Sequence, residues 1–378
     1  MAQRHLDPTV PMAGPAPTGD ALAGYLRAQA TEFLRALRLH RETGSGANGA
    51  EGSVDAARAL RRSARRISAS LHTFQSLLDT DWCEGMRPEL AWVSGTLAME
   101  HAYTARLERL LSALHRLSGS TALPAQVDAE VAPAAGSRAA GAAPVPQRAA
   151  PRDAGLRNPP TPAQERGNLT VGAAKAGALL DRQLTLARTR AHSTALQALG
   201  SSRFHAIADK VAVLASEVPL TRSAATTDLR PLAAAAKDRL KDAVTALPLV
   251  TAGHPYNAAA LIHGLSPDTV PHPQDAPWHQ VRLLLRLHRY AREAVRGEPD
   301  GTSVVDLRLL SAGQALNRHR DASEAAAAAA QAARTPRIAP ATAYALGVLH
   351  ADQRHEVEAA RFAFQQAWQK EAEAVSTR

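Results

Sequence analysis

Five arginines within nine residues are the strongest chemical signal in the sequence. Residues 57–74 read ARALRRSARRISASLHTF, and no acidic residue separates Arg58, Arg61, Arg62, Arg65 and Arg66. A solvated helix face usually mixes charges, because opposite charges one turn apart stabilise a helix and like charges destabilise it. A guanidinium group stays charged at any cellular pH and can hold two phosphate oxygens at once. The cluster therefore predicts contact with an anion.

The whole chain is also basic. Its 378 residues include 44 Lys and Arg against 35 Asp and Glu, a formal net charge of +9, and the pI is near 10.2. Such an excess indicates nucleic acid, acidic lipid or another polyanion as the partner, but it does not choose among them.

A second stretch repeats the first. WHQVRLLLRLHRYAREAV aligns with it at an offset of 221 residues, and GTLAMEHA aligns further on with QALNRHRD after a two-residue gap. The corresponding pairs are Arg58 and His279, Arg61 and Arg282, and Arg65 and Arg286. Repetition at this period predicts two similar helical bundles related by a pseudo-two-fold axis, rather than a short-period solenoid.

Helical geometry predicts which side chains of each stretch share a face. At about 100° per residue, the five arginines of the first stretch fall within an arc of roughly 140°, and apolar side chains fill the opposite side. In the second stretch, His279, Arg282, Arg286 and Arg289 fall within roughly 80°. The apolar faces are Leu60, Ala64, Ile67, Leu71 and Phe74 in the first stretch, and Leu283, Leu284, Leu287, Tyr290 and Ala294 in the second. Each stretch predicts a helix that packs on one side and carries a ladder of cations on another.

The composition favours helices throughout. Hydrophobic residues make up 45% of the chain and charged residues 21%, which is typical of a globular protein, whereas the aromatic content of 4% disfavours strands. We expect an almost all-α protein. Residues 1–20 read as a disordered tail, 21–120 as an N-terminal helical half, 121–168 as a Pro/Ala-rich linker and 169–372 as a C-terminal helical half.

Several segments in a fixed order carry a family resemblance. ELAWVSGTLAMEH, ALGSSRFHAIAD, WHQVRLLLRLHRYAREAV and YALGVLHADQRHEVEAARFAFQQAW follow one another along the chain. With the duplicated basic ladders, they resemble the CHAD family (conserved histidine α-helical domain) over residues 21–372, as one domain. The resemblance implies two helical bundles facing each other across a basic groove or pore. It also implies binding of inorganic polyphosphate, often with targeting to polyphosphate granules.

The resemblance and the helical spacing together give the candidate polyphosphate-binding residues. Two of them, Lys237 and Lys241, lie one helical turn apart in LAAAAKDRLKDAVTAL and would add to the groove. The full set is Arg58, Arg61, Arg62, Arg65, Arg66, Lys237, Lys241, His279, Arg282, Arg286, Arg289 and His319.

The first repeat departs from the family pattern. Arg58 stands where the pattern has its histidine, Ser68 replaces a residue that is commonly basic, and the first Arg-Asp pair reads His101-Ala102. The second repeat keeps more, including His319-Arg320-Asp321. The departures predict binding that is weaker or weighted toward the C-terminal half.

Catalysis is disfavoured by the sequence. It contains no P-loop, GxSxG or HExxH motif. His254, His263, His272 and His279 suggest a metal site, but their Pro-broken spacing without Cys or clustered carboxylates argues against one. We expect a non-enzymatic binding protein without a cofactor.

The compartment and two alternative functions complete the expectations. A single cysteine, Cys83, and the lack of both a signal peptide and a run of about 18 apolar residues predict a cytoplasmic protein with no membrane partner. A nucleic-acid-binding protein would use the same arginines but should add stacking aromatics. A helical scaffold with a degenerate groove would bind polyanions only weakly. Nothing in the sequence predicts the oligomeric state.

Overall fold

The chain folds into helices in every part that the structure describes. The structure is a computed structural model, and it describes residues 16–43, 50–119, 162–254, 265, 272–296 and 306–376. The α-helices are α1 (Gly19–Thr43), α2 (Ala50–Thr73), α3 (Thr80–Leu117), α4 (Pro162–Leu199), α5 (Ser202–Ser216), α6 (Arg230–Thr245), α7 (Leu249–Ala252), α9 (Ala276–Arg296), α10 (Leu307–Ala333) and α11 (Pro340–Ser376). In these ranges the only β-type pairing is one isolated bridge, between Leu78 and Leu220. The all-α prediction is confirmed.

The predicted tail and linker fall mostly outside the described residues. Positions 1–15 and 120–161 are not described, so the expectations for the tail and most of the linker lie beyond the structure. Helix α1 begins at Gly19, inside the predicted tail, and α4 begins at Pro162, inside the predicted linker. Helical structure therefore starts earlier at both places than composition predicted.

The apolar face expected for the first basic stretch is buried in α2. Leu60, Ala64, Ile67, Leu71 and Phe74 are all 0% exposed. They lie on one side of the helix at spacings of three or four residues, which is the pattern of a helix packed along one stripe. Arg58, Arg61 and Arg62 therefore face away from this core, whereas Arg66 is itself buried.

The apolar face of α9 differs in part from the prediction. Trp278, Val281 and Leu285 are buried, whereas Leu283 is 46% exposed. Leu283 lies about 200° around the helix from Val281, so a helix that packs through Val281 turns Leu283 toward solvent. The run of leucines in this stretch is thus not a single packing face.

Helix α3 is one continuous helix of 38 residues. Its start is fixed by Asp79, whose carboxylate accepts a hydrogen bond of 2.8 Å from the backbone N–H of Trp82. A side-chain cap of this kind satisfies a backbone donor that the first turn leaves free. The helix continues through Pro88, and its C-terminal part reaches a different core from its N-terminal part.

Two of the three hydrophobic cores join helices from both sides of the predicted linker. The first combines α1, α2 and the start of α3 with α5 and α6. The second combines the end of α3 with α4, α10 and α11, and the third lies among α6, α9, α10 and α11. Helices α4 and α5 follow the linker in sequence but pack on α3 and α1. The cores therefore do not divide where the sequence composition changes.

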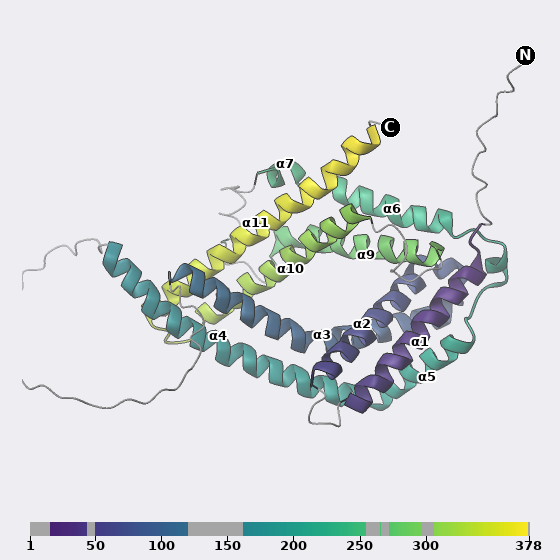
Figure 1. The fold of residues 1–378 in the computed structure, drawn as a ribbon, viewed down its shortest axis with the longest axis horizontal. Coiled ribbons are helices and arrows are strands. Elements are labelled where there is room, and N and C mark those ends of the chain that lie inside the picture. Colours follow the sequence, from purple (N-terminus) through teal and green to yellow (C-terminus); the bar gives the residue numbers. More distant parts are fainter. Residues whose placement is uncertain are drawn as a thin grey trace, which may run out of the picture.

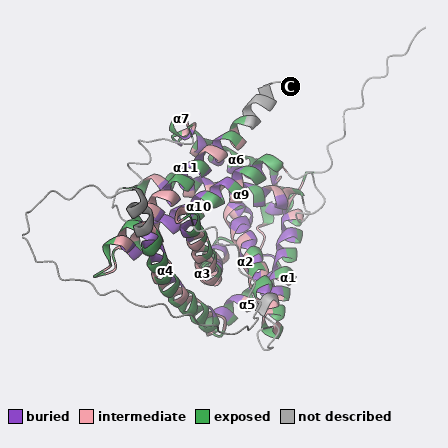
Figure 2. Ribbon diagram, turned by 60° about the vertical axis from the view of Figure 1, so that its left-hand side comes forward, coloured by how far each residue is buried: buried purple, intermediate pink, exposed green. Residues whose placement is uncertain are grey.

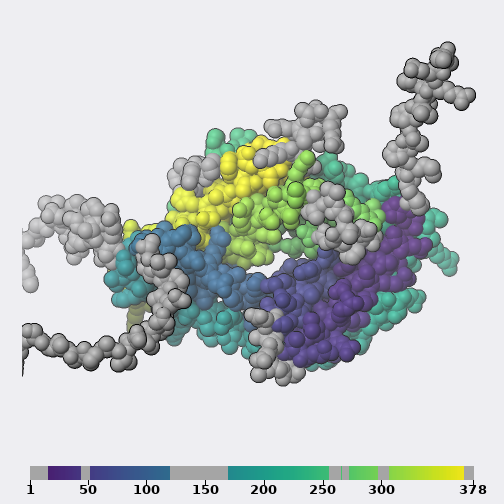
Figure 3. Space-filling view, viewed as in Figure 1, coloured from purple at the N-terminus to yellow at the C-terminus, as the bar shows by residue number. Residues whose placement is uncertain are grey.

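These contacts arrange the helices around a central space (Figure 1). Buried residues gather on the sides of the helices that face one another (Figure 2). In the space-filling view a hollow opens between the blue surface of α2 and α3 and the green surface of α10 (Figure 3). Within the described ranges, no helix is long and apolar enough to cross a membrane.

A close crossing of α4 and α11 depends on a glycine. A Cβ atom on Gly172 would collide with the backbone carbonyl of Ala341, which does not move as a flexible side chain can. The missing side chain lets the two backbones approach, and it places α11 against the second core.

Candidate anion-binding site

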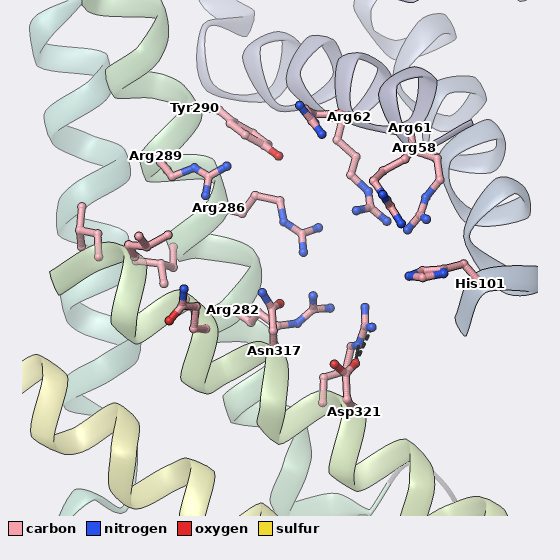
Figure 4. Close-up of a pocket in the computed structure, with 17 residues that line it drawn as sticks. Arg58, Arg61, Arg62, His101, Arg282, Arg286, Arg289, Tyr290, Asn317 and Asp321 are labelled. Atoms are coloured by element: carbon pink, nitrogen blue, oxygen red, sulfur yellow. Dashed lines mark hydrogen bonds and ion pairs between the residues drawn. The ribbon is translucent and has the colours of Figure 1, made fainter. Parts of the chain in front are cut away.

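Four helices surround a basic cavity of about 470 Å³, called here the arginine pocket. Helices α2, α9 and α10 supply most of its walls, and α3 contributes His101 (Figure 4). Eight of the described residues that line it are arginines: Arg58, Arg61, Arg62, Arg65, Arg282, Arg286, Arg289 and Arg320. The one acidic residue in the described lining, Asp321, accepts a hydrogen bond of 2.6 Å from Arg320. The lining therefore has a large excess of positive charge.

The two basic stretches of the sequence meet across this pocket. Arg61 on α2 and Arg282 and Arg286 on α9 point into the same space from different walls (Figure 4). The packing of Leu60 on α2 and of Val281 and Leu285 on α9 turns the arginines of each helix toward the cavity. Seven of the twelve candidate residues line the arginine pocket: Arg58, Arg61, Arg62, Arg65, Arg282, Arg286 and Arg289.

Several of these guanidinium groups are partly removed from water without a counter-ion. Nε of Arg61 and both Nε and Nη1 of Arg282 are buried and have no hydrogen-bond partner among the described residues. A buried donor without a partner costs about 1–3 kcal/mol, and more when it is charged. The site thus leaves donors available for an acceptor that none of the described residues provides.

Burial and repulsion between neighbouring guanidinium groups lower the pKa values of four arginines in the pocket. Burial, followed by the charge of Arg286, lowers the pKa of Arg65 to about 10 and that of Arg282 to about 10. The pKa values of Arg61 and Arg286 are lowered as well, with burial again the main cause. All four stay charged at neutral pH, so the folded protein concentrates positive charge that an anion would relieve.

Arg66 has a different role from its neighbours on α2. Its Nε donates a hydrogen bond of 2.8 Å to Oε2 of Glu293 on α9, and both side chains are largely buried. Tyr25 on α1 donates to the same oxygen over 3.2 Å. Arg66 does not line the arginine pocket, although it lines an adjoining cavity that also touches Arg62 and Arg289. The Arg66–Glu293 ion pair connects α2 to α9, and Glu293 neutralises the charge of Arg66.

His279 and His319 also lie outside the lining of the arginine pocket. His319 is 1% exposed, and its ring stacks on Trp278 with 5.7 Å between ring centroids. Its Nε2 accepts a hydrogen bond of 3.3 Å from Nε of Arg361, and burial lowers its pKa to about 4. His279 packs edge-on against His319, with 5.4 Å between centroids. The predicted ligand role of His319 does not fit this position, because neighbouring side chains enclose the ring.

The lysines predicted to extend the groove line a separate cavity. Lys237 and Lys241 on α6 border a space of about 750 Å³ together with His288 and Arg292 of α9. His288 and Arg292 lie about 120° around α9 from Arg282 and Arg286, so the two spaces border different faces of this helix, with Leu309 of α10 lining both. The structure does not bring these lysines together with the arginines.

Ten of the seventeen described residues that line the arginine pocket were not among the sequence candidates. Arg320, Asn317 and His101 all line the arginine pocket. On α10 a signal was present, because Gly313, Asn317 and Arg320 follow each other at spacings of four and three residues and so share one face. His101 lies on an exposed part of α3, and the residues around it in the sequence form no pattern that predicts its place in the pocket.

The described residues include no group of three or more His, Cys, Asp or Glu side chains that could hold a metal ion. Of the four histidines that suggested a metal site, His263 lies outside the described residues. The ring of His272 accepts a hydrogen bond of 3.3 Å from the backbone N–H of Gln274 and caps a short 3-10 helix. That contact gives His272 a structural role at the start of the segment leading to α9.

Comparisons with known proteins agree with the family resemblance. The family model described as CHAD domain matches residues 28–330. Among solved structures, PptA from Streptomyces chartreusis is 74% identical in sequence, with a TM-score of 0.71. That match covers 94% of this chain and 100% of the other chain. No curated protein matches the chain.

Proposed function

The chain belongs to the CHAD family, and we propose that it binds inorganic polyphosphate in the arginine pocket without transforming it. The family is known for polyphosphate binding, and seven of the candidate arginines line one cavity. The proposed ligand contacts are Arg58, Arg61, Arg62, Arg65, Arg282, Arg286, Arg289 and Arg320.

The observation that carries this proposal is the unbalanced charge of the pocket. Arg61 and Arg282 keep buried donors without partners among the described residues, and the one acid in the described lining, Asp321, accepts a hydrogen bond from Arg320. Polyphosphate carries a charge on each phosphate, so several guanidinium groups can bind one chain. A hydrogen bond to a charged group contributes about 1.5–3 kcal/mol, and the planar guanidinium suits paired phosphate oxygens.

A duplication would explain why the pocket has two similar walls. The aligned pairs Arg61 and Arg282, and Arg65 and Arg286, lie on α2 and α9 and face the same cavity. This placement supports the proposal that two helical bundles related by a pseudo-two-fold axis form a basic groove. In a cell, such a groove would bring the protein to polyphosphate granules.

Nucleic acid is the main competing ligand. It would use the same phosphate contacts but would gain from aromatic side chains that stack on bases. Tyr290 is the aromatic residue in the described lining, and it is 5% exposed. A ring so enclosed offers little surface for stacking, which favours a polyanion without bases.

Calorimetric titration tests the proposal. The full-length protein would be titrated with long-chain polyphosphate, single-stranded DNA and duplex DNA at two salt concentrations, alongside the double variant Arg282→Ala/Arg286→Ala. We expect polyphosphate to bind more tightly than either DNA, and the double substitution to cost a few kcal/mol of binding free energy. Equal binding of all three polyanions, unchanged by the substitutions, would indicate a diffuse positive surface and would overturn the proposal.

A further inference from the structure

A second cavity borders another face of α9 and shares Leu309 of α10 with the arginine pocket. It has a volume of about 750 Å³, within the range of roughly 300–1,000 Å³ that is usual for small-molecule sites. Helices α6, α9, α10 and α11 contribute to its wall, and we call it the α6–α9 pocket. Its described lining consists of Ala233, Ala234, Lys237, Leu240, Lys241, Thr245, His288, Arg292, Asp306, Leu309 and Trp368.

One part of this wall is cationic. Lys237 and Lys241 lie one turn apart on α6, are exposed, and form no ion pair with another described residue. The acid of the pocket, Asp306, is already engaged, because Nη1 of Arg292 lies 3.1 Å from its Oδ2 and its other oxygen caps α10. The two lysines are therefore available to an anion, and Asp306 does not neutralise them.

Another part of the wall is apolar and aromatic. Leu240 and Leu309 are buried members of the third core, and Trp368 is partly buried, stacked on Phe364 with 5.7 Å between centroids. A tryptophan held in this way offers a fixed ring face to a ligand. Apolar surface next to unpaired lysines is unlike the arginine pocket, where charge dominates the lining.

His288 adds a polar group that the fold does not use. It is 6% exposed, and its Nδ1 is buried with no hydrogen-bond partner among the described residues. Burial, reinforced by Arg292 and Lys237, lowers its pKa to about 4, so the ring is neutral at physiological pH. A neutral imidazole can donate one hydrogen bond and accept another. The ring can therefore contribute hydrogen bonding without adding charge.

We propose that the α6–α9 pocket binds a small organic anion with an aromatic body and a single phosphate or carboxylate group. The anionic group would contact Lys237 and Lys241, while the aromatic body would pack against Trp368, which is only partly buried. A bare polyphosphate chain would leave the apolar wall unused. This site is separate from the proposed polyphosphate function and does not depend on it.

The test uses 1-naphthyl phosphate as the probe, titrated calorimetrically into the full-length protein. Lys237→Gln/Lys241→Gln removes the proposed anion contacts, and Lys175→Gln/Lys210→Gln removes two lysines outside both pockets as the matched control. We expect the first pair of substitutions to weaken binding at least tenfold and the control pair to leave it unchanged. Inorganic phosphate and uncharged 1-naphthol should each bind at least tenfold more weakly than the probe.

Parallel titrations separate this proposal from the polyphosphate function. The variant Arg282→Ala/Arg286→Ala should bind 1-naphthyl phosphate as the unsubstituted protein does, even though it loses polyphosphate affinity. Failure of the probe to bind at millimolar concentration would overturn the second site. Loss of probe binding in the arginine variant, or loss of polyphosphate rather than probe affinity in Lys237→Gln/Lys241→Gln, would also overturn it.

Discussion

Arg361 and Asp275 form an ion pair inside the protein, with Nη2 of the arginine 2.7 Å from Oδ1 of the aspartate. The two side chains are 5% and 0% exposed. Nη1 of Arg354 lies 2.8 Å from Oδ2 of Asp275. Two arginines that are two turns apart on α11 therefore pair with one carboxylate. Asp275 directly precedes α9, and the cluster therefore fixes the start of the helix that carries Arg282 and Arg286.

Removal of the Asp275 charge should destabilise the protein strongly. In Asp275→Asn, Arg354 and Arg361 lose their common counter-ion in a buried place, and breaking a buried ion pair in this way costs about 3–5 kcal/mol. Urea denaturation measures this change as a lower midpoint at unchanged slope. Asp55→Asn is the control, since its pair with Arg58 is exposed and should be worth less than about 1 kcal/mol. Equal effects of the two substitutions would contradict the structural role of Asp275.

Stability should fall as the pH drops from 6.5 toward 4. Burial lowers the pKa of His319 to about 4 and that of His288 to about 4, so in this window the unfolded chain binds protons that the folded chain does not. The free energy of unfolding then decreases by up to about 1.4 kcal/mol per pH unit for each histidine. Glu358 acts in the opposite direction, because burial raises its pKa.

Denaturation at several pH values checks this slope. His319→Gln should flatten it relative to the unsubstituted protein, and His115→Gln, which changes a histidine on the exposed side of α3, serves as the control. A slope that His319→Gln leaves unchanged would mean that other groups set the acid sensitivity.

Substitution of a pocket arginine should stabilise the ligand-free protein. Arg282 is partly buried beside Arg286, and that environment lowers its pKa to about 10, which marks its charged form as disfavoured by the fold. Arg282→Met keeps the apolar stem and removes the charge, with an expected gain of about 0.5–2 kcal/mol. Thermal melting in the absence of polyanions measures the gain.

The same variant should respond less to ligand. With saturating polyphosphate the melting temperature should rise by less in Arg282→Met than in the unsubstituted protein. Arg41→Met, an exposed position on α1 outside the arginine pocket, should change neither value. A destabilised ligand-free Arg282→Met would show that this arginine supports the fold.

The salt dependence of polyphosphate binding should show whether an individual arginine contacts a phosphate. Neutralising a linear polyanion releases condensed counter-ions, so the logarithm of the association constant falls linearly with the logarithm of the salt concentration. Arg286→Ala should reduce that slope by about 0.7–0.9, as one phosphate contact is lost. Arg203→Ala removes a surface arginine that pairs with Glu89 and should leave the slope unchanged. Titrations at four or more salt concentrations distinguish the two results.

The sequence predicted the walls of the arginine pocket from local patterns. In α2 the spacing of Leu60, Ile67 and Leu71 determined which side is buried, and that in turn determined where Arg61 and Arg65 face. On α9, Arg282 and Arg286 line the same pocket, although the predicted apolar face included Leu283, which is exposed. Periodicity sufficed on α2 because that helix packs along one stripe and most of its arginines occupy another.

The positions of His319, Arg320 and Arg66 depended on distant parts of the chain. His319 and Arg320 are neighbours on α10, yet only Arg320 lines the arginine pocket, because His319 is enclosed by other side chains. Arg361, 42 residues further on, is a partner of the buried histidine. Arg66 likewise meets Glu293, 227 residues away. A pattern read within one helix contains no information about such partners.

Contact between Trp278 and His319 gives the protein an internal optical probe. The two rings stack with 5.7 Å between centroids, and Arg361 lies 5.3 Å from the centre of the indole. Indole emission is sensitive to charge and to proton donors at such short range, and a protonated imidazole quenches it. The sequence has four tryptophans, so in a variant that retains Trp278 and replaces the other three, indole emission would record whether the packing of α9, α10 and α11 is intact.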